Sequence, residues 1–189
     1  LDFSKKCLTN EHFEAYRSSK NLVSGNYKRD NFSILYIYIN ENKKEYWETW
    51  GNDDGSHVIH YGELGTKGNS KVIKPSLLKN PSKIIQKKIN KLVEDGFQQI
   101  DDVFTLMVEY KVDGFGTPED LEKRSRLQDQ MNEILGWTGL GNCDGGSVGS
   151  NTMEVCNYVV DFDIAKKVIE ENLKNTEFKD YTRIYDENV

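Results

Sequence analysis

The chain has 189 residues, a net charge of −6 and 37% hydrophobic residues. This apolar content can build a core, which excludes wholesale disorder, and the length fits one large domain or two small ones. No apolar run reaches the roughly 20 residues of a membrane helix. Residues 1–20 contain no apolar segment typical of a signal peptide. We therefore expect a cytoplasmic protein that has no membrane partner.

The cysteines favour a reducing compartment. Cys7, Cys143 and Cys156 are odd in number, and no two of them form a CxxC pair. A disulfide framework is therefore not expected. A single bridge between Cys143 and Cys156 stays open, because paired strands can bring two cysteines to bonding distance.

The charge is divided unevenly between the halves of the chain. Residues 1–103 contain 16 basic and 14 acidic residues, a net charge of +2, whereas residues 104–189 contain 9 and 17, a net charge of −8. Such an asymmetry indicates two modules with different surfaces. We predict a polar lead-in over residues 1–30, in which Thr9 or Asn10 begins a short helix, and then domains at 31–103 and 104–189.

Strands are predicted throughout the first domain. The segments 32–39, 45–50 and 57–64 are rich in β-branched and aromatic residues, turn-forming residues separate them, and a fourth strand is expected at 71–73. A helix begins at Asn80-Pro81, a capping residue followed by proline at the first helical position, and Gly96 ends it. Its expected apolar stripe contains Ile84, Ile85, Ile89, Leu92 and Val93.

The second domain begins with an alternating strand at 104–112. Thr117 and Asp120 have the spacing of a capping box, and either Asp161 or Asp163 begins a second helix. A strand at 152–160 precedes that helix, and a last strand is predicted at 181–185. The residues expected to be buried on the two helices are Leu121, Leu127, Met131, Ile134 and Leu135, then Ile164, Ala165, Val168, Ile169 and Leu173.

Glycines crowd the segment 136–150 between the first helix and the following strand. A phosphate loop would need GxGxxG between a strand and a helix, or a GK[ST] motif, and neither is present. A tight turn or bulge is the favoured interpretation. If residues 139–143 add a short strand, the order is βαββαβ. The expected fold class is then α+β: an antiparallel sheet with one packed helix, followed by a ferredoxin-like module.

The segment Tyr61–Gly68, YGELGTKG, resembles the signature of WGR domains. In that family a strand carrying Trp-Gly-Arg leads into a hydrophobic residue, a glycine, two variable residues and another glycine. A later helix ends at a glycine plus an aromatic residue, and Gly96-Phe97 occupies that place here. The resemblance covers about residues 30–103. It implies a module that contacts DNA, as in DNA-dependent ADP-ribosyltransferases.

The sequence departs from the family pattern at Tyr61, which replaces the tryptophan, and at Glu63, which replaces the arginine. Arginine can bind phosphate through two hydrogen bonds, whereas glutamate repels it. Tyr61 can stack on a base or pack within the sheet. Between Glu63 and Glu94, eight lysines and no acid form either a phosphate-facing patch or a solvated surface. The candidate nucleic-acid contacts are Tyr61, Lys67, Lys71, Lys83 and Lys87.

No arrangement of residues indicates an enzyme. His57 and His60 are three apart on a predicted strand, so they point to opposite faces and cannot bind one metal ion together. Cys143 stands beside Asp144, which opposes the cationic surroundings of a reactive thiolate. The run Asp53-Asp54-Gly55 is explained better by a hairpin turn than by a calcium loop. We therefore expect no catalytic residue, no metal and no cofactor.

The second domain is similar to the regulator of ribonuclease activity B family in its Asp144-Gly145-Gly146 turn and its topology. That resemblance implies an acidic ferredoxin-like protein that binds and inhibits an enzyme. We expect a protein-binding function, of the kind found in bacterial inhibitors and immunity proteins, and a basic partner. Nucleic-acid binding through the first domain is the alternative. The candidate partner contacts are Glu119, Glu122, Asp129, Glu133, Glu170, Glu171 and Glu177.

Overall fold

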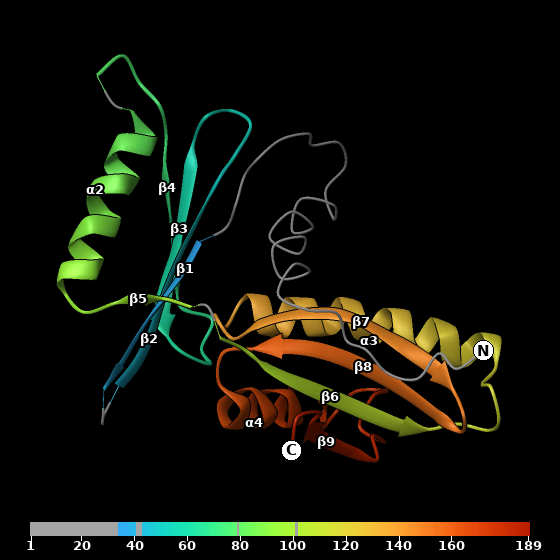
Figure 1. The fold of residues 1–189 in the computed structure, drawn as a ribbon. Coiled ribbons are helices and arrows are strands. Elements are labelled where there is room, and N and C mark those ends of the chain that lie inside the picture. The colour runs from blue at the N-terminus through green and yellow to red at the C-terminus, as the bar shows by residue number, and fades with distance from the viewer. Residues whose placement is uncertain (1–33, 41–42, 79, 101) are drawn as a thin grey trace. The chain divides into compact units, whose positions relative to one another are not determined.

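The computed structural model describes residues 34–40, 43–78, 80–100 and 102–189. These residues form two compact units that divide between residues 101 and 102 (Figure 1). The predicted boundary lay after residue 103. The predicted lead-in over residues 1–30, with its helix at Thr9 or Asn10, lies outside the described residues.

The first unit is an antiparallel sheet with one helix, as the sequence predicted. Its strands are β1 (Ile34–Asn40), β2 (Lys43–Gly51), β3 (His57–Glu63), β4 (Asn69–Ile73) and β5 (Gln98–Gln99). Their order across the sheet is β4-β3-β2-β1-β5, and every neighbouring pair is antiparallel. The helix α2 (Pro81–Glu94) connects β4 to β5 (Figure 1).

Local sequence rules set both ends of α2. The Asn80 side chain accepts a hydrogen bond from the backbone N–H of Lys83 at 3.2 Å, and Pro81 occupies the first turn. Gly96 follows the helix with a φ of +95°, the left-handed conformation that glycine adopts without a steric penalty. Both predicted ends of this helix are therefore confirmed.

The core of the first unit lies between α2 and one face of the sheet. Trp47 and Ile59 from the sheet pack against Ile85 and Ile89 from the helix. Three further side chains border this cluster, namely Ile73, Leu92 and Phe97. Val93 was predicted to belong to the buried stripe, and this was wrong: it is 55% exposed, because it lies on the flank of the stripe that Ile85, Ile89 and Leu92 form.

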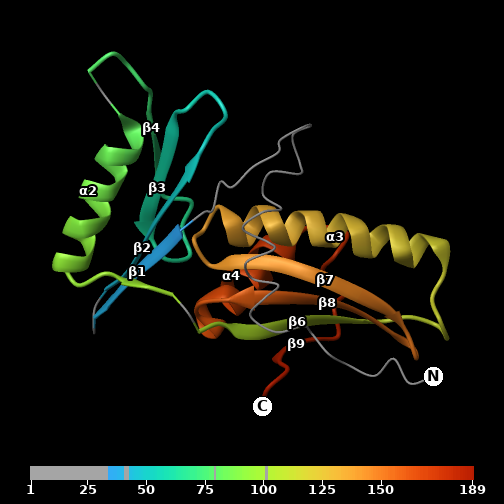
Figure 2. The same ribbon diagram turned by 45° about the horizontal axis from the view of Figure 1, so that its top comes forward.

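The second unit has the ferredoxin-like arrangement. Its elements are β6 (Phe104–Lys111), α3 (Pro118–Gly136), β7 (Gly141–Gly149), β8 (Thr152–Val159), α4 (Phe162–Leu173) and β9 (Arg183–Asp186). The strand order is β7-β8-β6-β9, and all neighbours are antiparallel. The α3 helix packs on β7 and β8, α4 packs on β6, and the two helices touch (Figure 2). They therefore cover the same face of the sheet.

Capping residues begin both helices of this unit. The Thr117 side chain and the Asp120 side chain exchange hydrogen bonds with each other's backbone, completing the predicted capping box. Asp161, not Asp163, caps α4 by accepting from the Ile164 N–H at 3.0 Å. Leu121 was expected to be buried, but it is 48% exposed. It lies near the start of α3, whereas the buried residues of this helix begin at Leu127.

The glycine-rich segment is a full edge strand, longer than the short strand predicted at 139–143. A bulge between Cys143 and Gly145 interrupts its pairing with β8, as the bulge interpretation expected. Polar side chains of α3 bind its backbone: Asn132 accepts from the Cys143 N–H at 3.1 Å, and Arg124 donates to the Gly146 carbonyl at 3.2 Å. Among the described residues, no helix is long and apolar enough to cross a membrane.

Candidate functional site

A row of acidic side chains runs along the solvent side of α3. Glu119, Glu122, Asp129 and Glu133 are all exposed, and we call these four residues the acidic row. Their spacings follow the helical period, so they share one stripe opposite the buried face of α3. With a rise of 1.5 Å per residue, the row is about 20 Å long.

The basic residues nearest this row are already paired. Arg126, which falls within the row, donates two hydrogen bonds to Glu177, at 3.1 and 2.8 Å. The pKa of the Glu177 carboxyl is lowered, chiefly by these hydrogen bonds. Lys123 on the flank binds Asp180 at 2.8 Å. Glu177, predicted as a partner contact, therefore neutralises a cation that would otherwise interrupt the acidic row.

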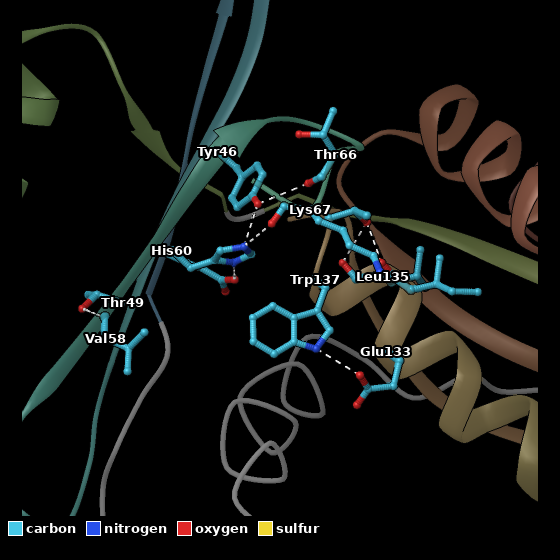
Figure 3. A network of polar contacts seen from close by, with 12 residues as sticks. Tyr46, Thr49, Val58, His60, Thr66, Lys67, Glu133, Leu135 and Trp137 are labelled. Atoms are coloured by element: carbon cyan, nitrogen blue, oxygen red, sulfur yellow. Dashed lines mark hydrogen bonds and ion pairs between the residues drawn. The ribbon is translucent and has the colours of Figure 1, made fainter. Parts of the chain in front are cut away.

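An exposed tryptophan ends the acidic row. Trp137 is the residue at the C-terminal cap of α3, and its side chain is 44% exposed. Its indole N–H donates to the Glu133 carboxylate at 3.0 Å, which holds the ring beside the last acid of the row (Figure 3). Tryptophan is one of the residue types that most often dominate the energy of protein interfaces.

The acids of α4 do not form a comparable row. Glu171 is exposed and Glu170 is half-buried. The same helix also carries Lys166 and Lys167, and Lys174 is the residue at its C-terminal cap. The surface of α4 is therefore of mixed charge. Of the seven predicted partner contacts, the structure gathers four on one helix face, assigns Glu177 to an ion pair and leaves two in this mixed surface.

In the first unit, the turn between β3 and β4 explains the glycines of the YGELGTKG segment. A Cβ atom on Gly62 would lie 2.7 Å from the Cα of Gly68, so the two backbones can approach only as glycines. Gly68 has a φ of +57°, and a Cβ there would collide with the Tyr46 hydroxyl and the Tyr61 carbonyl. The glycine spacing therefore folds the turn back against the sheet.

A buried polar network holds the same turn (Figure 3). His60 Nδ1 lies 2.7 Å from a Glu48 carboxylate oxygen, and His60 Nε2 lies 2.7 Å from the Lys67 carbonyl and 2.9 Å from the Tyr46 hydroxyl. The Tyr46 hydroxyl also donates to the Thr66 carbonyl at 3.2 Å. The residues Tyr46, Glu48 and His60 are all buried.

The donors and acceptors of this network fix where its protons lie. A carbonyl can only accept, so His60 Nε2 carries a proton toward Lys67, and one more proton lies between Nδ1 and Glu48. Burial, and then the charge of Glu48, hold the pKa of the Tyr46 hydroxyl above its usual range, so it stays a donor. Because these groups are buried, the network positions the turn and offers no surface to a substrate.

Tyr61 stands among acids. It is 43% exposed, and Glu63 lies two residues farther along the same strand, hence on the same face. Glu45 is the cross-strand neighbour of Glu63 and forms an ion pair with Lys43 at 2.7 Å. Because Lys43 offsets the charge of Glu45, Glu63 is the acid that opposes the approach of a phosphate to Tyr61.

The five candidate nucleic-acid contacts lie in three places. Tyr61 and Lys67 lie at the end of β3 and in the turn after it, whereas Lys83 and Lys87 are in the first half of α2. The end of α2 lies toward the Glu63 end of the sheet, because Gly96 contacts Tyr38 and Tyr38 pairs with the strand that carries Glu45. Lys71, on the edge strand β4, is exposed. The structure does not assemble these residues into one patch.

The remaining candidate ligands stay apart. His57 and His60 lie on opposite faces of β3, as predicted, and the described residues contain no cluster of histidine, cysteine and acidic side chains that could hold a metal ion. Cys143 and Cys156 are both buried thiols, and no disulfide joins them. Cys143 is opposite Asn157 while Cys156 is opposite Gly145, so the two thiols face different sides of the sheet.

A second polar cluster, like the network of Tyr46, Glu48 and His60, was not predicted from the sequence. Glu109 and Glu154 are directly opposite each other on β6 and β8, which would be unfavourable without a counter-charge. Arg183 donates to Glu109 at 2.6 Å, and the Tyr185 hydroxyl donates to Glu154 at 3.0 Å. Only the pairing of β9 with β6 brings these residues together. The cluster fastens the last strand of the chain to the sheet.

Comparisons with known proteins identify no family. No protein-family model matches the chain, and no curated protein matches it. One solved structure that matches is a protein from Bacteroides fragilis, determined by a structural genomics consortium, with 18% identity and a TM-score of 0.33. The match covers 37% of this chain and 20% of that chain.

Proposed function

We propose that the protein binds a basic protein partner through the acidic row and Trp137, and that this binding inhibits or neutralises the partner. The observation that supports this proposal is the row itself: four exposed acids in one stripe, with the intervening Arg126 neutralised by Glu177 and an exposed tryptophan at the end. Such a surface offers both long-range attraction and an anchor for a desolvated contact.

The second unit is the one we propose to carry this function, since it holds most of the negative charge of the chain. Charge of one sign on a rigid helix steers an oppositely charged partner and raises the rate of association. No catalytic step, metal or cofactor is part of the proposal. Occupying a partner's basic surface is sufficient to block whatever that surface binds.

A pull-down with the full chain tests the proposal. The wild-type protein and a Glu122→Lys/Asp129→Lys variant are immobilised and exposed to a lysate of the source cells, and captured proteins are identified by mass spectrometry. A matched control, Asp163→Lys/Glu171→Lys, makes the same change of charge on α4. We expect a basic protein that the wild type and the control retain and the α3 variant loses.

Two results would count against this assignment. Equal loss in both variants would show that only the overall charge matters, and capture unaffected by the α3 variant would place the binding surface elsewhere. Circular dichroism of each variant establishes that all of them are folded. The substituted side chains are exposed, so little change in stability is expected.

We further propose that the first unit is a WGR-like module that has lost tight DNA binding. The sheet, the packed helix and the turn shaped by Gly62 and Gly68 support the relationship to WGR domains, and Glu63 on the same face as Tyr61 supports the loss of binding. Fluorescence anisotropy with nicked and blunt duplexes at physiological salt tests it. Binding tighter than about 10⁻⁶ M, the strong end of ordinary non-specific affinity, would contradict the loss. The Glu63→Arg variant is expected to bind more tightly than the wild type.

A further inference from the structure

Two leucines of the first unit are fully exposed to solvent. Leu77 and Leu78, in the connection between β4 and α2, have side chains 106% and 98% exposed. Isolated exposed leucines are common on protein surfaces, but an adjacent pair at the tip of a connection forms a convex apolar point. Nothing within the described part of the first unit covers this point.

The tip has a defined setting. Pro75 and Pro81 bracket the leucines, and proline fixes its own φ and restricts the residue before it. The leucines border an open hollow of about 820 Å³ at the beginning of α2. Gly55 of the β2–β3 hairpin and Ile84 of the helix line its other sides.

Lysines surround this apolar point. Lys74, Lys83 and Lys87 are exposed, and Lys83 and Lys87 line the hollow beside the leucines. The first turn of α2 contains no acid, and the sequence contains none between Glu63 and Glu94. Two aspartates of the nearby hairpin, Asp53 and Asp54, are the local counter-charges. The pKa of Asp54 is lowered chiefly by its hydrogen bonds with Ser56, and to a smaller extent by the charge of Lys74. Lysines therefore outnumber acids around the tip.

These features select among possible occupants. A second copy of the same tip would bring lysines against lysines, which is unfavourable. A nucleic acid would satisfy the lysines but would offer no aliphatic surface to the leucines. An acidic protein segment could satisfy both only through a pocket shaped to receive the convex tip. An anionic bilayer satisfies both without such a pocket, because its head groups attract lysine and its hydrocarbon accepts leucine.

We propose that the exposed side chains of Lys74, Leu77, Leu78, Lys83 and Lys87 dock the protein onto the surface of an anionic lipid bilayer. Leu77 and Leu78 insert at the boundary between head groups and acyl chains, and Lys74, Lys83 and Lys87 contact the head groups. This is a peripheral contact through a loop and the start of a helix. It departs from the expectation of no membrane partner, which rested on the absence of a membrane-spanning segment and did not address peripheral binding. It uses a different unit from the acidic row, so it stands independently of the proposed protein partner.

Co-sedimentation of the full chain with lipid vesicles tests the proposal. One set of vesicles is phosphatidylcholine alone, and in the other phosphatidylglycerol replaces about a third of the lipid. We expect the wild type to sediment with the anionic vesicles only, and less as salt is raised. Leu77→Ser/Leu78→Ser and Lys83→Glu/Lys87→Glu are each expected to weaken partitioning by roughly tenfold or more.

Matched controls alter the other unit. Phe115→Ser/Leu121→Ser removes two exposed apolar side chains, Lys167→Glu/Lys174→Glu reverses two exposed lysines, and both are expected to bind like the wild type. A wild type that sediments with neither kind of vesicle would overturn the proposal. Binding that survives the leucine substitutions would overturn it as well, since the lysines alone would then account for attraction to any anion.

Discussion

The close approach of the Gly62 backbone to Gly68 can be tested by substitution. We expect Gly62→Ala to destabilise the first unit by about 1–3 kcal/mol, the usual cost of forcing an extra carbon into a packed site. Urea denaturation followed by tryptophan fluorescence measures this. A Trp137→Phe background leaves Trp47 and Trp50 of the first unit as the only reporters. Ser70→Ala, at an exposed position of β4, is the control. An alanine at Gly62 as stable as this control would refute the close approach.

The buried pair of Glu48 and His60 gives a second prediction. His60→Leu leaves the Glu48 carboxylate buried without its imidazole, so we expect a loss of about 3–5 kcal/mol in the free energy of unfolding. The double variant Glu48→Leu/His60→Leu removes both partners of the buried pair, and we expect it to be more stable than the single variant. A double-mutant cycle in the same fluorescence assay measures the coupling. Strictly additive effects would show that the two side chains do not interact.

Single residues were predictable from sequence where their partners are close in the chain. Asn80 and Thr117 were identified as caps because a cap binds a backbone N–H only three residues away. The pairs Glu48–His60 and Glu109–Arg183 join residues 12 and 74 positions apart, and only the strand register brings them together. No local pattern marks such pairs, so the buried network and the Arg183 cluster could not be foreseen.

At the scale of elements, the pairing of Arg126 with Glu177 ties α3 to the segment after α4. The folded-state pKa of Glu177 is lower than its unfolded value. The stabilising contribution is therefore complete above the unfolded pKa and is lost as the pH falls through the folded pKa. We expect Glu177→Gln to lower the melting temperature at neutral pH, and the difference from wild type to disappear in acid. A difference that persists unchanged below both pKa values would contradict the ion pair.

The elements themselves were largely predictable, with two instructive exceptions. The strands and helices with clear periodicity appeared where expected, because period two and period 3.6 directly reflect a half-buried strand and helix. The glycine-rich segment was predicted to be a tight turn or bulge with at most a short strand, since glycine weakens strands. It contains a bulge, but Gly141–Gly149 is a full strand, because β8 and the side chains of Arg124 and Asn132 bind its backbone. Leu121 looked buried because the pattern of a helix does not reveal where it meets the sheet.

At the scale of the whole molecule, the structure shows where the unequal charges of the two halves lie. Part of the acidic excess of the second half forms the acidic row on α3. The nearby cations Arg126 and Lys123 do not offset this row, because they form ion pairs with Glu177 and Asp180. The lysine-rich segment of the first half becomes the surroundings of the Leu77–Leu78 tip. Composition predicted two different surfaces, but which charges remain exposed and unpaired depends on the tertiary structure.

We propose that the acidic row steers a basic partner toward the protein. The rate of association with that partner tests this steering most directly. Once the partner is identified by the pull-down, stopped-flow mixing measures association at several salt concentrations for the wild type and for Glu122→Lys/Asp129→Lys. We predict that wild-type association slows steeply with salt, and that the variant associates at least about tenfold more slowly at low salt, with a shallower salt dependence. Equal association rates for the two proteins, or a wild-type rate that does not respond to salt, would contradict the account.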